Sequence, residues 1–434
     1  MMNLDSICNG IQSEPFLQFC GRVSKVRRDS IRVFIPNAKV GSMCMAHSAR
    51  ARIPLEIVSL DPAGHTAMPL DDLSNLQLGD LVTLEEEQAV IPVGPQLLGQ
   101  VVDSMCVSLD TQESLALRET IPLYGSSLNP MKRTIIREPI DLGIRSVNAL
   151  LSCGRGQRAG IFAGSGVGKS VLLGMMARYT SADVVVVGLI GERGKEVREF
   201  IEHDLGEEGR RKSVIVVETA EKSPIRRARG AYVSTAIAEY FRKQGKQVLL
   251  LMDSLTRFAM AQREIGMAAG EPPTSKGYTP GVFAGISKLV ERAGNFGDEG
   301  SITGLYTVLV EGDDLEDPVA DSARSLLDGH LVLSRKLANK GQYPAIDVLQ
   351  SVSRVMDQVT EKNHSSEARR IKQILARYQD NEDAINLGLY VRGSERSIDE
   401  AIEKEPQIRE FLMQARDERA SFYDSKTGLH ELLK

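Results

Sequence analysis

The chain has 434 residues, of which 42% are hydrophobic and 26% charged, and its formal net charge is -5. At roughly 150 residues per domain this length predicts about three globular domains, and the composition excludes a disordered or fibrous protein. The negative net charge argues against the basic surface that nucleic acids and anionic membranes bind. No run of about 18 apolar residues occurs, so we expect neither a membrane-spanning helix nor a secretion signal.

The first segment, residues 1–92, is predicted to be a small β-barrel. Short apolar runs alternate with turn-forming residues there, and the runs lie at 31–35, 55–60 and 81–84. The sequences Asp61-Pro62-Ala63-Gly64 and Gly79-Asp80 are typical of the turns between such strands. We therefore expect an all-β module at this end of the chain.

Two further segments follow, with different patterns. Over residues 93–350 apolar strands alternate with amphipathic helices, which predicts an α/β domain with a mainly parallel sheet covered on both faces. Over residues 351–434 apolar positions such as Ile371, Ile374, Leu375 and Tyr378 recur three to four residues apart. That spacing predicts a C-terminal helical domain.

The segment from Ala163 to Ser170 is predicted to form a phosphate-binding loop. It lies between an apolar strand and a helix, the context that such a loop requires, although Ala163 stands where the strict pattern has glycine. The glycines let backbone amides curl around phosphate oxygens, Lys169 neutralises the β and γ phosphates, and the Ser170 hydroxyl ligates Mg²⁺. The residues expected to bind nucleotide are Gly164, Ser165, Gly166, Val167, Gly168, Lys169 and Ser170.

Carboxylates end two of the apolar strands. The run 248–252 leads into Asp253, which we expect to complete the magnesium shell with Ser170, and the run 184–190 leads into Gly191-Glu192-Arg193. Ligands of open α/β sheets bind at the carboxyl ends of the strands, so both carboxylates are expected beside the phosphate loop. Phosphoanhydride hydrolysis needs a group that orients and deprotonates water, and we assign that role to Glu192, with Arg193 beside the γ phosphate.

These motifs together resemble those of the export ATPases of flagellar and type III secretion systems, relatives of the rotary ATP synthase catalytic subunits. Further matching stretches are Ile91 to Gly99, Gly270 to Pro273, Lys276 to Tyr278, Thr307 to Asp314 and Asp328 to Asp347. Within the family, the stretches Glu291 to Asn295 and Asp317 to Arg324 favour the flagellar branch.

The resemblance implies an N-terminal β-barrel, a RecA-like ATPase core and a C-terminal helical domain. It implies a homohexamer that uses ATP and Mg²⁺ at sites between subunits, where Arg354 reaches into the neighbour's site and Tyr343 packs on the adenine. The implied partners are a stator-like regulator, a central-stalk protein, export chaperones with their substrates, and membrane proteins of the export gate. Leu4, Ile7, Cys8 and Ile11 fall on one helical face, as a regulator-binding extension requires.

The function expected from this resemblance is ATP hydrolysis that releases chaperones and promotes export of unfolded proteins, at the cytoplasmic face of the inner membrane. An RNA-dependent ring helicase is an alternative, which the acidic charge and the aromatic content of 5% disfavour. A catalytic subunit of a rotary proton-translocating ATPase is a second alternative, and a docking scaffold with weak hydrolysis is a third.

Overall fold

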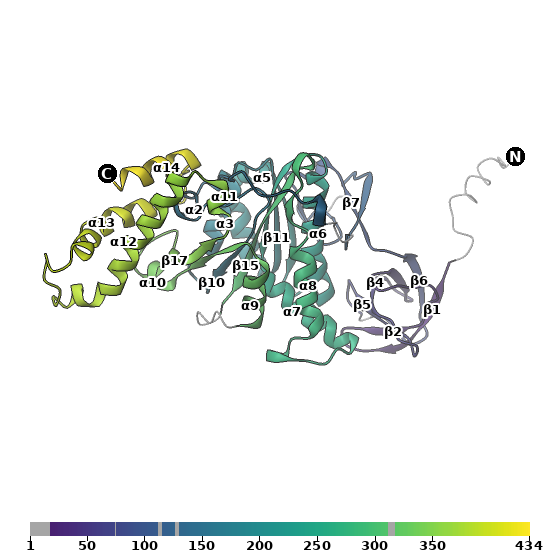
Figure 1. The fold of residues 1–434 in the computed structure, drawn as a ribbon. Coiled ribbons are helices and arrows are strands. Elements are labelled where there is room, and N and C mark those ends of the chain that lie inside the picture. Colours follow the sequence, from purple (N-terminus) through teal and green to yellow (C-terminus); the bar gives the residue numbers. More distant parts are fainter. Residues whose placement is uncertain (1–17, 74, 112–114, 126–129, 311–316) are drawn as a thin grey trace.

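The computed structural model describes residues 18–73, 75–111, 115–125, 130–310 and 317–434. A barrel stands at one end of the molecule, a sheet covered by helices in the middle, and a group of helices at the other end (Figure 1). The N-terminal face with Leu4, Ile7, Cys8 and Ile11, and the part of the Thr307 to Asp314 stretch beyond residue 310, lie outside the described residues.

The N-terminal segment folds as a closed six-stranded antiparallel barrel in the order β1-β2-β5-β4-β3-β6. Its alternating apolar residues face inward because side chains of a strand point to opposite sides: Val33 and Ile35 are fully buried, whereas Phe34 is exposed. The strands are β1 (Cys20–Val26), β2 (Ile31–Val33), β3 (Met43–His47), β4 (Arg52–Ser59), β5 (His65–Pro69) and β6 (Leu81–Glu86). The predicted barrel is confirmed.

The central sheet has nine strands, with the order β17-β16-β10-β15-β13-β11-β12-β8 and β14 paired to β15. All its pairings are parallel except those of β17 with β16 and of β14 with β15. The strands are β8 (Val101–Val102), β10 (Arg158–Ala163), β11 (Val184–Glu192), β12 (Ser213–Thr219), β13 (Gln247–Asp253), β14 (Gly294–Asn295), β15 (Ser301–Leu309), β16 (Gly329–Leu333) and β17 (Ile346–Ser353). A separate hairpin-like pair consists of β7 (Val90–Val93) and β9 (Glu119–Pro122).

Helices bury both faces of this sheet, which explains why its strands are apolar without alternation. Val184 and Val186 of β11 pack with one layer, and Val185 and Val187 with the other. The first layer contains α6 (Pro224–Arg242), α7 (Leu255–Ala269), α8 (Pro280–Val290) and α9 (Pro318–Leu326). The second contains α2 (Arg145–Leu150), α3 (Lys169–Tyr179), α4 (Gly194–Glu199) and a π-helical turn, η3 (Phe200–Leu205), which α5 (Gly206–Arg211) follows.

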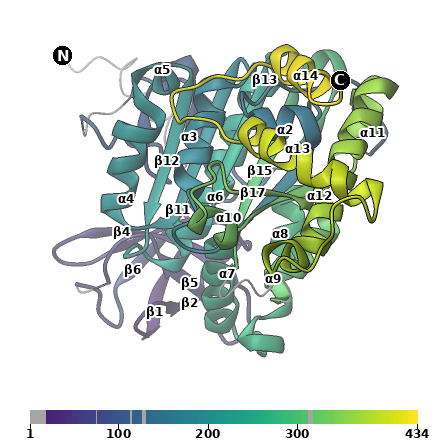
Figure 2. The ribbon, with the colours of Figure 1, turned by 90° about the vertical axis from the view of Figure 1, so that its left-hand side faces the viewer.

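The C-terminal helices complete the second layer and face the viewer in Figure 2. They are α12 (Lys362–Asn386), α13 (Arg396–Leu412) and α14 (Phe422–Glu431), preceded by the short α10 (Arg335–Asn339) and α11 (Met356–Val359). Ile371 and Ile374 are buried against the core and Leu375 and Tyr378 half-buried, as the helical spacing predicted. The boundary expected between residues 350 and 351 falls inside β17, and the domain limits stay predictions.

The α/β fold class is thus confirmed, with its barrel and its C-terminal helices. Within the described part of the chain, no helix combines the length and apolar character needed to cross a bilayer.

Candidate functional site

The predicted phosphate loop connects the carboxyl end of β10 to the first turn of α3. Gly166 and Gly168 have φ values of 74° and 85°, a left-handed backbone that favours glycine. Val167 is buried in the core and anchors the loop, whereas Ser165 and Gly166 are exposed. Because α3 begins at Lys169, the unpaired amides of its first turn and its dipole face the loop and favour an anion there.

Lys169 lies at the centre of a cluster formed by residues at or near the carboxyl ends of three strands. Its Nζ pairs with Oδ1 of Asp253, the last residue of β13, and lies 3.5 Å from Oε1 of Glu192, the last residue of β11. The Thr307 hydroxyl on β15 donates to the same Asp253 Oδ1 at 2.6 Å. Burial disfavours the lysine charge, but the two carboxylates outweigh this effect and raise the pKa of Lys169.

Glu192 has a pKa raised to about 7. Burial contributes most to this shift, the Asp253 carboxylate adds to it, and the Lys169 ammonium opposes it. Glu196, on the first turn of α4, also raises the pKa through a hydrogen bond with Glu192 and through its charge. A carboxyl group that titrates near neutral pH suits a general base, which must be largely deprotonated and still basic.

The Arg193 side chain does not join this cluster. It is 81% exposed and pairs with Glu196 at 3.1 Å from Nη1 to Oε1. Its predicted place beside a γ phosphate therefore requires the side chain to leave Glu196 when nucleotide binds.

A residue that the sequence reasoning did not assign, Arg257, packs against the same corner. A Cβ built on Gly191 would lie 2.9 Å from the Cβ of Arg257, so this arginine sits directly beside the residue that precedes Glu192. The buried Nε of Arg257 has no hydrogen-bond partner among the described residues. The signal in the sequence was its place four residues after Asp253, but the sequence contains nothing that brings it to Gly191.

Ser170 and Asp253 provide hard oxygen donors of the kind that Mg²⁺ prefers. Ser170 is an exposed residue of the first turn of α3, and Asp253 is buried with Lys169 and Thr307 on one carboxylate oxygen. The donor set fits the metal, with Ser170 as the accessible ligand.

Tyr343 lies over the helix end of the phosphate loop. A Cβ on Gly168 would be 3.3 Å from its ring, and the side chain is 45% exposed. Its backbone carbonyl accepts a hydrogen bond from the Gln414 amide N–H at 2.9 Å, which ties this segment to the C-terminal helices. An exposed aromatic face beside the loop is able to stack on a base.

Arg354, by contrast, is far from this chain's own phosphate loop. It follows β17, whose last residue, Ser353, pairs with Gly329 at the start of β16. Since β16 runs parallel to β10, Arg354 is at the amino ends of these strands, and the loop is at their carboxyl ends. The structure therefore brings Lys169, Glu192 and Asp253 together and leaves Arg354 exposed at the opposite edge of the sheet.

Comparison with known proteins gives two family matches. Residues 143–353 match the ATP synthase alpha/beta family, nucleotide-binding domain, and residues 360–431 match the T3SS EscN ATPase C-terminal domain. A flagellum-specific ATP synthase of Pseudomonas aeruginosa is 51% identical over 401 residues, which cover 91% of this chain and 89% of that protein.

Solved structures are similar over nearly the whole chain. The assembled ATPase EscN from the enteropathogenic E. coli type III secretion system has a TM-score of 0.90 at 38% identity, covering 95% of this chain and 100% of that one. EscN in complex with its central stalk EscO has a TM-score of 0.88 at 38% identity, with the same coverage.

Proposed function

Since this chain belongs to the family of flagellum-specific and type III secretion system ATPases, and is an ATP-hydrolysing enzyme, we propose that it serves a flagellar-type or virulence protein export apparatus. There it hydrolyses ATP to ADP and phosphate to release chaperones and promote export of unfolded proteins. The observation that carries this proposal is the convergence of Lys169, Asp253 and Glu192 at the phosphate loop.

In the proposed mechanism, ATP binds with its phosphates on the amides of residues 164–168 and the first turn of α3. The anionic phosphates attract Lys169 away from the carboxylates that hold it in the free protein. Glu192 then orients a water molecule and accepts its proton. Ser170 and Asp253 would hold Mg²⁺, which would neutralise charge on the phosphates.

The remaining site residues act on either end of the nucleotide. Tyr343 stacks on the adenine, supported by its position against Gly168. Arg193 moves from Glu196 to the γ phosphate, and Arg257, whose side chain packs beside Gly191, supplies a second cation next to Glu192. The two arginines favour the negatively charged phosphates, and the tyrosine ring favours the adenine base at the other end of ATP.

We further propose a homohexamer in which Arg354 of one subunit completes the site of its neighbour. The exposure of Arg354 and its distance from its own phosphate loop support a role in trans, and the solved EscN structures are of an assembled ATPase. A guanidinium that arrives from the neighbour stabilises charge on the transferred phosphoryl group and makes hydrolysis depend on assembly.

The proposed partners are a central-stalk protein, supported by the structure of EscN with its stalk EscO, a stator-like regulator, export chaperones with their substrates, and the membrane proteins of the export gate. The proposed location is the cytoplasmic face of the inner membrane, held there by these partners. The net charge of -5 argues against binding to nucleic acid, which is itself negatively charged.

The test is the substitution Glu192→Gln, assayed as purified protein and in cells. Without the carboxylate no group accepts the proton from water, so we expect turnover to fall by about 100-fold or more while ATP binding persists. Export of secreted proteins into the medium should fall with it. The matched control is Glu199→Gln, which makes the same chemical change on the exposed Glu199 of α4.

Normal turnover in Glu192→Gln would remove Glu192 from the mechanism. Lost turnover with unchanged export would support the ATPase activity and contradict its role in export.

A further inference from the structure

The backbone of Arg354 is held by Asp328. The Arg354 N–H donates to the Asp328 carbonyl at 3.1 Å, and the guanidinium Nη2 donates a long bond, 3.5 Å, to the carbonyl of Arg324. The exposed side chain is therefore weakly held, while its backbone is fixed. The groups that fix the position of the Asp328 carbonyl therefore also fix the backbone from which the Arg354 side chain extends.

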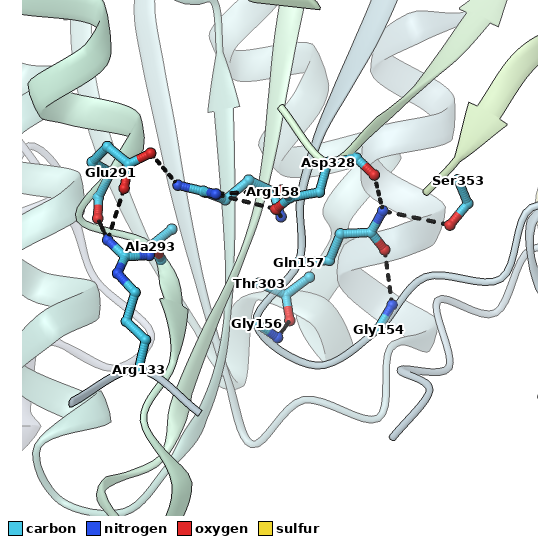
Figure 3. Close-up of polar contacts among 10 residues, drawn as sticks. All are labelled: Arg133, Gly154, Gly156, Gln157, Arg158, Glu291, Ala293, Thr303, Asp328 and Ser353. Carbon is cyan, nitrogen blue, oxygen red and sulfur yellow. Dashed lines mark hydrogen bonds and ion pairs between the residues drawn. The ribbon is translucent and has the colours of Figure 1, made fainter. Parts of the chain in front are cut away.

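Asp328 is gripped in turn by Arg158, the first residue of β10 (Figure 3). The Arg158 backbone N–H and Nε both donate to Asp328 Oδ2 at 3.1 Å, and Nη2 donates to Oδ1 at 3.3 Å. The Asp328 N–H donates back to the Arg158 carbonyl at 2.7 Å. A two-pronged arginine–carboxylate contact of this kind fixes orientation as well as distance.

Gln157 fixes the same carbonyl from a second direction. Its Nε2 donates to the Asp328 carbonyl at 3.0 Å and to the Ser353 hydroxyl at 3.5 Å, and its Oε1 accepts from the Gly154 N–H at 2.9 Å. The residue is only 1% exposed. A buried amide with its donors and acceptor engaged has little freedom to rotate.

The far side of Arg158 is tied down as well. Its Nη1 lies 2.5 Å from Glu291 Oε1, and Glu291 also accepts from Arg133 Nη2 at 3.0 Å (Figure 3). Arg133 in turn donates a hydrogen bond to the Ala293 carbonyl at 3.1 Å. The guanidinium of Arg158 is thus clamped between two carboxylates and only 16% of its side chain is exposed.

The contacts of Asp328, Gln157, Arg158, Glu291 and Arg133 form one network. It begins at Arg158 on β10, the strand that ends in the chain's own phosphate loop. β10 has six residues, so at about 3.3 Å per residue the network and the loop are about 20 Å apart on one strand. Its residues take no part in the cluster that Lys169, Glu192, Asp253 and Thr307 form.

We propose that Asp328, held by Arg158 and Gln157, is a positioning residue that presents Arg354 to the neighbouring subunit's ATP. The inference rests on the proposed function, in which Arg354 acts in trans. A displacement of about 1 Å at a group that stabilises a transition state costs about 100-fold in rate, so a rigid support for this exposed side chain has a large effect.

The first experiment compares Asp328→Asn with the control Glu138→Gln in the full chain. Asparagine keeps the shape of Asp328 and loses the ionic grip on Arg158; Glu138 pairs with Arg155 near the same edge but is 69% exposed. We expect Asp328→Asn to lower kcat by about 10- to 100-fold with an unchanged KM for ATP, because its own phosphate loop is intact. The control should keep both constants. Unchanged kcat, or a raised KM, in Asp328→Asn would overturn the proposal.

The second experiment separates positioning from general damage by mixing subunits. Asp328→Asn subunits retain a working site and lack a placed Arg354, whereas Glu192→Gln subunits lack the base and retain Arg354. We expect a mixture of the two to hydrolyse ATP well above the sum of each alone, and a mixture of Asp328→Asn with Arg354→Ala to show no gain. A third mixture, Arg354→Ala with Glu192→Gln, is the reference for the action of Arg354 in trans. A gain in activity in this reference mixture, but none in the mixture of Asp328→Asn with Glu192→Gln, would overturn the role of Asp328. No gain in either mixture, with active wild-type rings, would contradict the action of Arg354 in trans, and with it both proposals.

Discussion

Glu192 is balanced between opposing electrostatic influences. Burial and the Asp253 carboxylate raise its pKa, Lys169 lowers it, and the result is a value of about 7. The group is protonated below that pH and cannot accept a proton from water there. In the free enzyme the active fraction therefore grows as the pH rises through about 7, and kcat/KM, which reports groups of the free enzyme, should rise with it and then level off.

Glu196→Gln tests this balance without touching the base. Glu196 raises the pKa of Glu192 through a hydrogen bond and its charge, so a neutral glutamine should move the rising limb of the kcat/KM profile to lower pH. The plateau at high pH should be close to that of the unsubstituted chain. A limb that stays in place, or moves to higher pH, would contradict the assignment of the limb to Glu192, and Glu199→Gln serves as the control on the same helix.

At the scale of elements, Gln414 joins the C-terminal helices to the nucleotide site. It follows α13 and is 6% exposed. Its amide side chain accepts from the Arg145 N–H at 2.8 Å and donates to the Gly143 carbonyl at 2.9 Å, while its own N–H reaches the Tyr343 carbonyl. One residue thus links the start of α2, the end of α13 and the segment that carries the aromatic ring beside the loop.

We expect Gln414→Ala to lower the free energy of unfolding by about 1–3 kcal/mol, because the half-buried Arg145 N–H loses its acceptor and the buried Gly143 carbonyl keeps only the Ala420 N–H as a donor. Chemical denaturation measures the change. The KM for ATP should rise as well, since Tyr343 loses a fixed neighbour. The control is Gln407→Ala, on the exposed face of α13, which should leave both quantities as they are. If Gln414→Ala had the same free energy of unfolding as the control, water would replace the hydrogen bonds of the Gln414 side chain without loss of stability.

At the scale of the whole molecule, a buried ion pair fastens the barrel to the sheet domain. Arg229 of α6 and Glu56 of β4 are 2% and 3% exposed, with 3.3 Å between Nη1 and Oε2. Tyr124 donates a hydrogen bond to the same carboxylate. Burial raises the pKa of Glu56, and Arg229 opposes this effect.

Arg229→Met should lower the free energy of unfolding by about 3–5 kcal/mol, because it leaves a buried carboxyl group without its cation. The pKa of Glu56 then rises further above the ordinary value of 4.5, so the folded state binds a proton that the unfolded state releases, and the stability loss should grow as the pH rises from there. The double variant Glu56→Gln/Arg229→Met should be more stable than Arg229→Met alone. A double variant that is less stable than the single one would contradict the pairing; the exposed Lys39 of the barrel, changed to Met, is the control.

The sequence by itself determined the features that contiguous residues encode. The glycine pattern and the flanking strand and helix identified the phosphate loop, and apolar runs identified the strands that end in Glu192 and Asp253. Periodicity distinguished the barrel, the α/β core and the C-terminal helices. These signals are local, since a strand, a turn or a helix face is specified by neighbours within a few residues.

Only the tertiary structure decided which of these features meet. The insertion of β15 between β10 and β13 brings Thr307 to Asp253, and the packing of α7 brings Arg257 to Gly191. The same order of strands sends Arg354 to the edge opposite the loop. Strand order and long-range pairing depend on how whole elements bury their surfaces against one another, which no local pattern of residues contains.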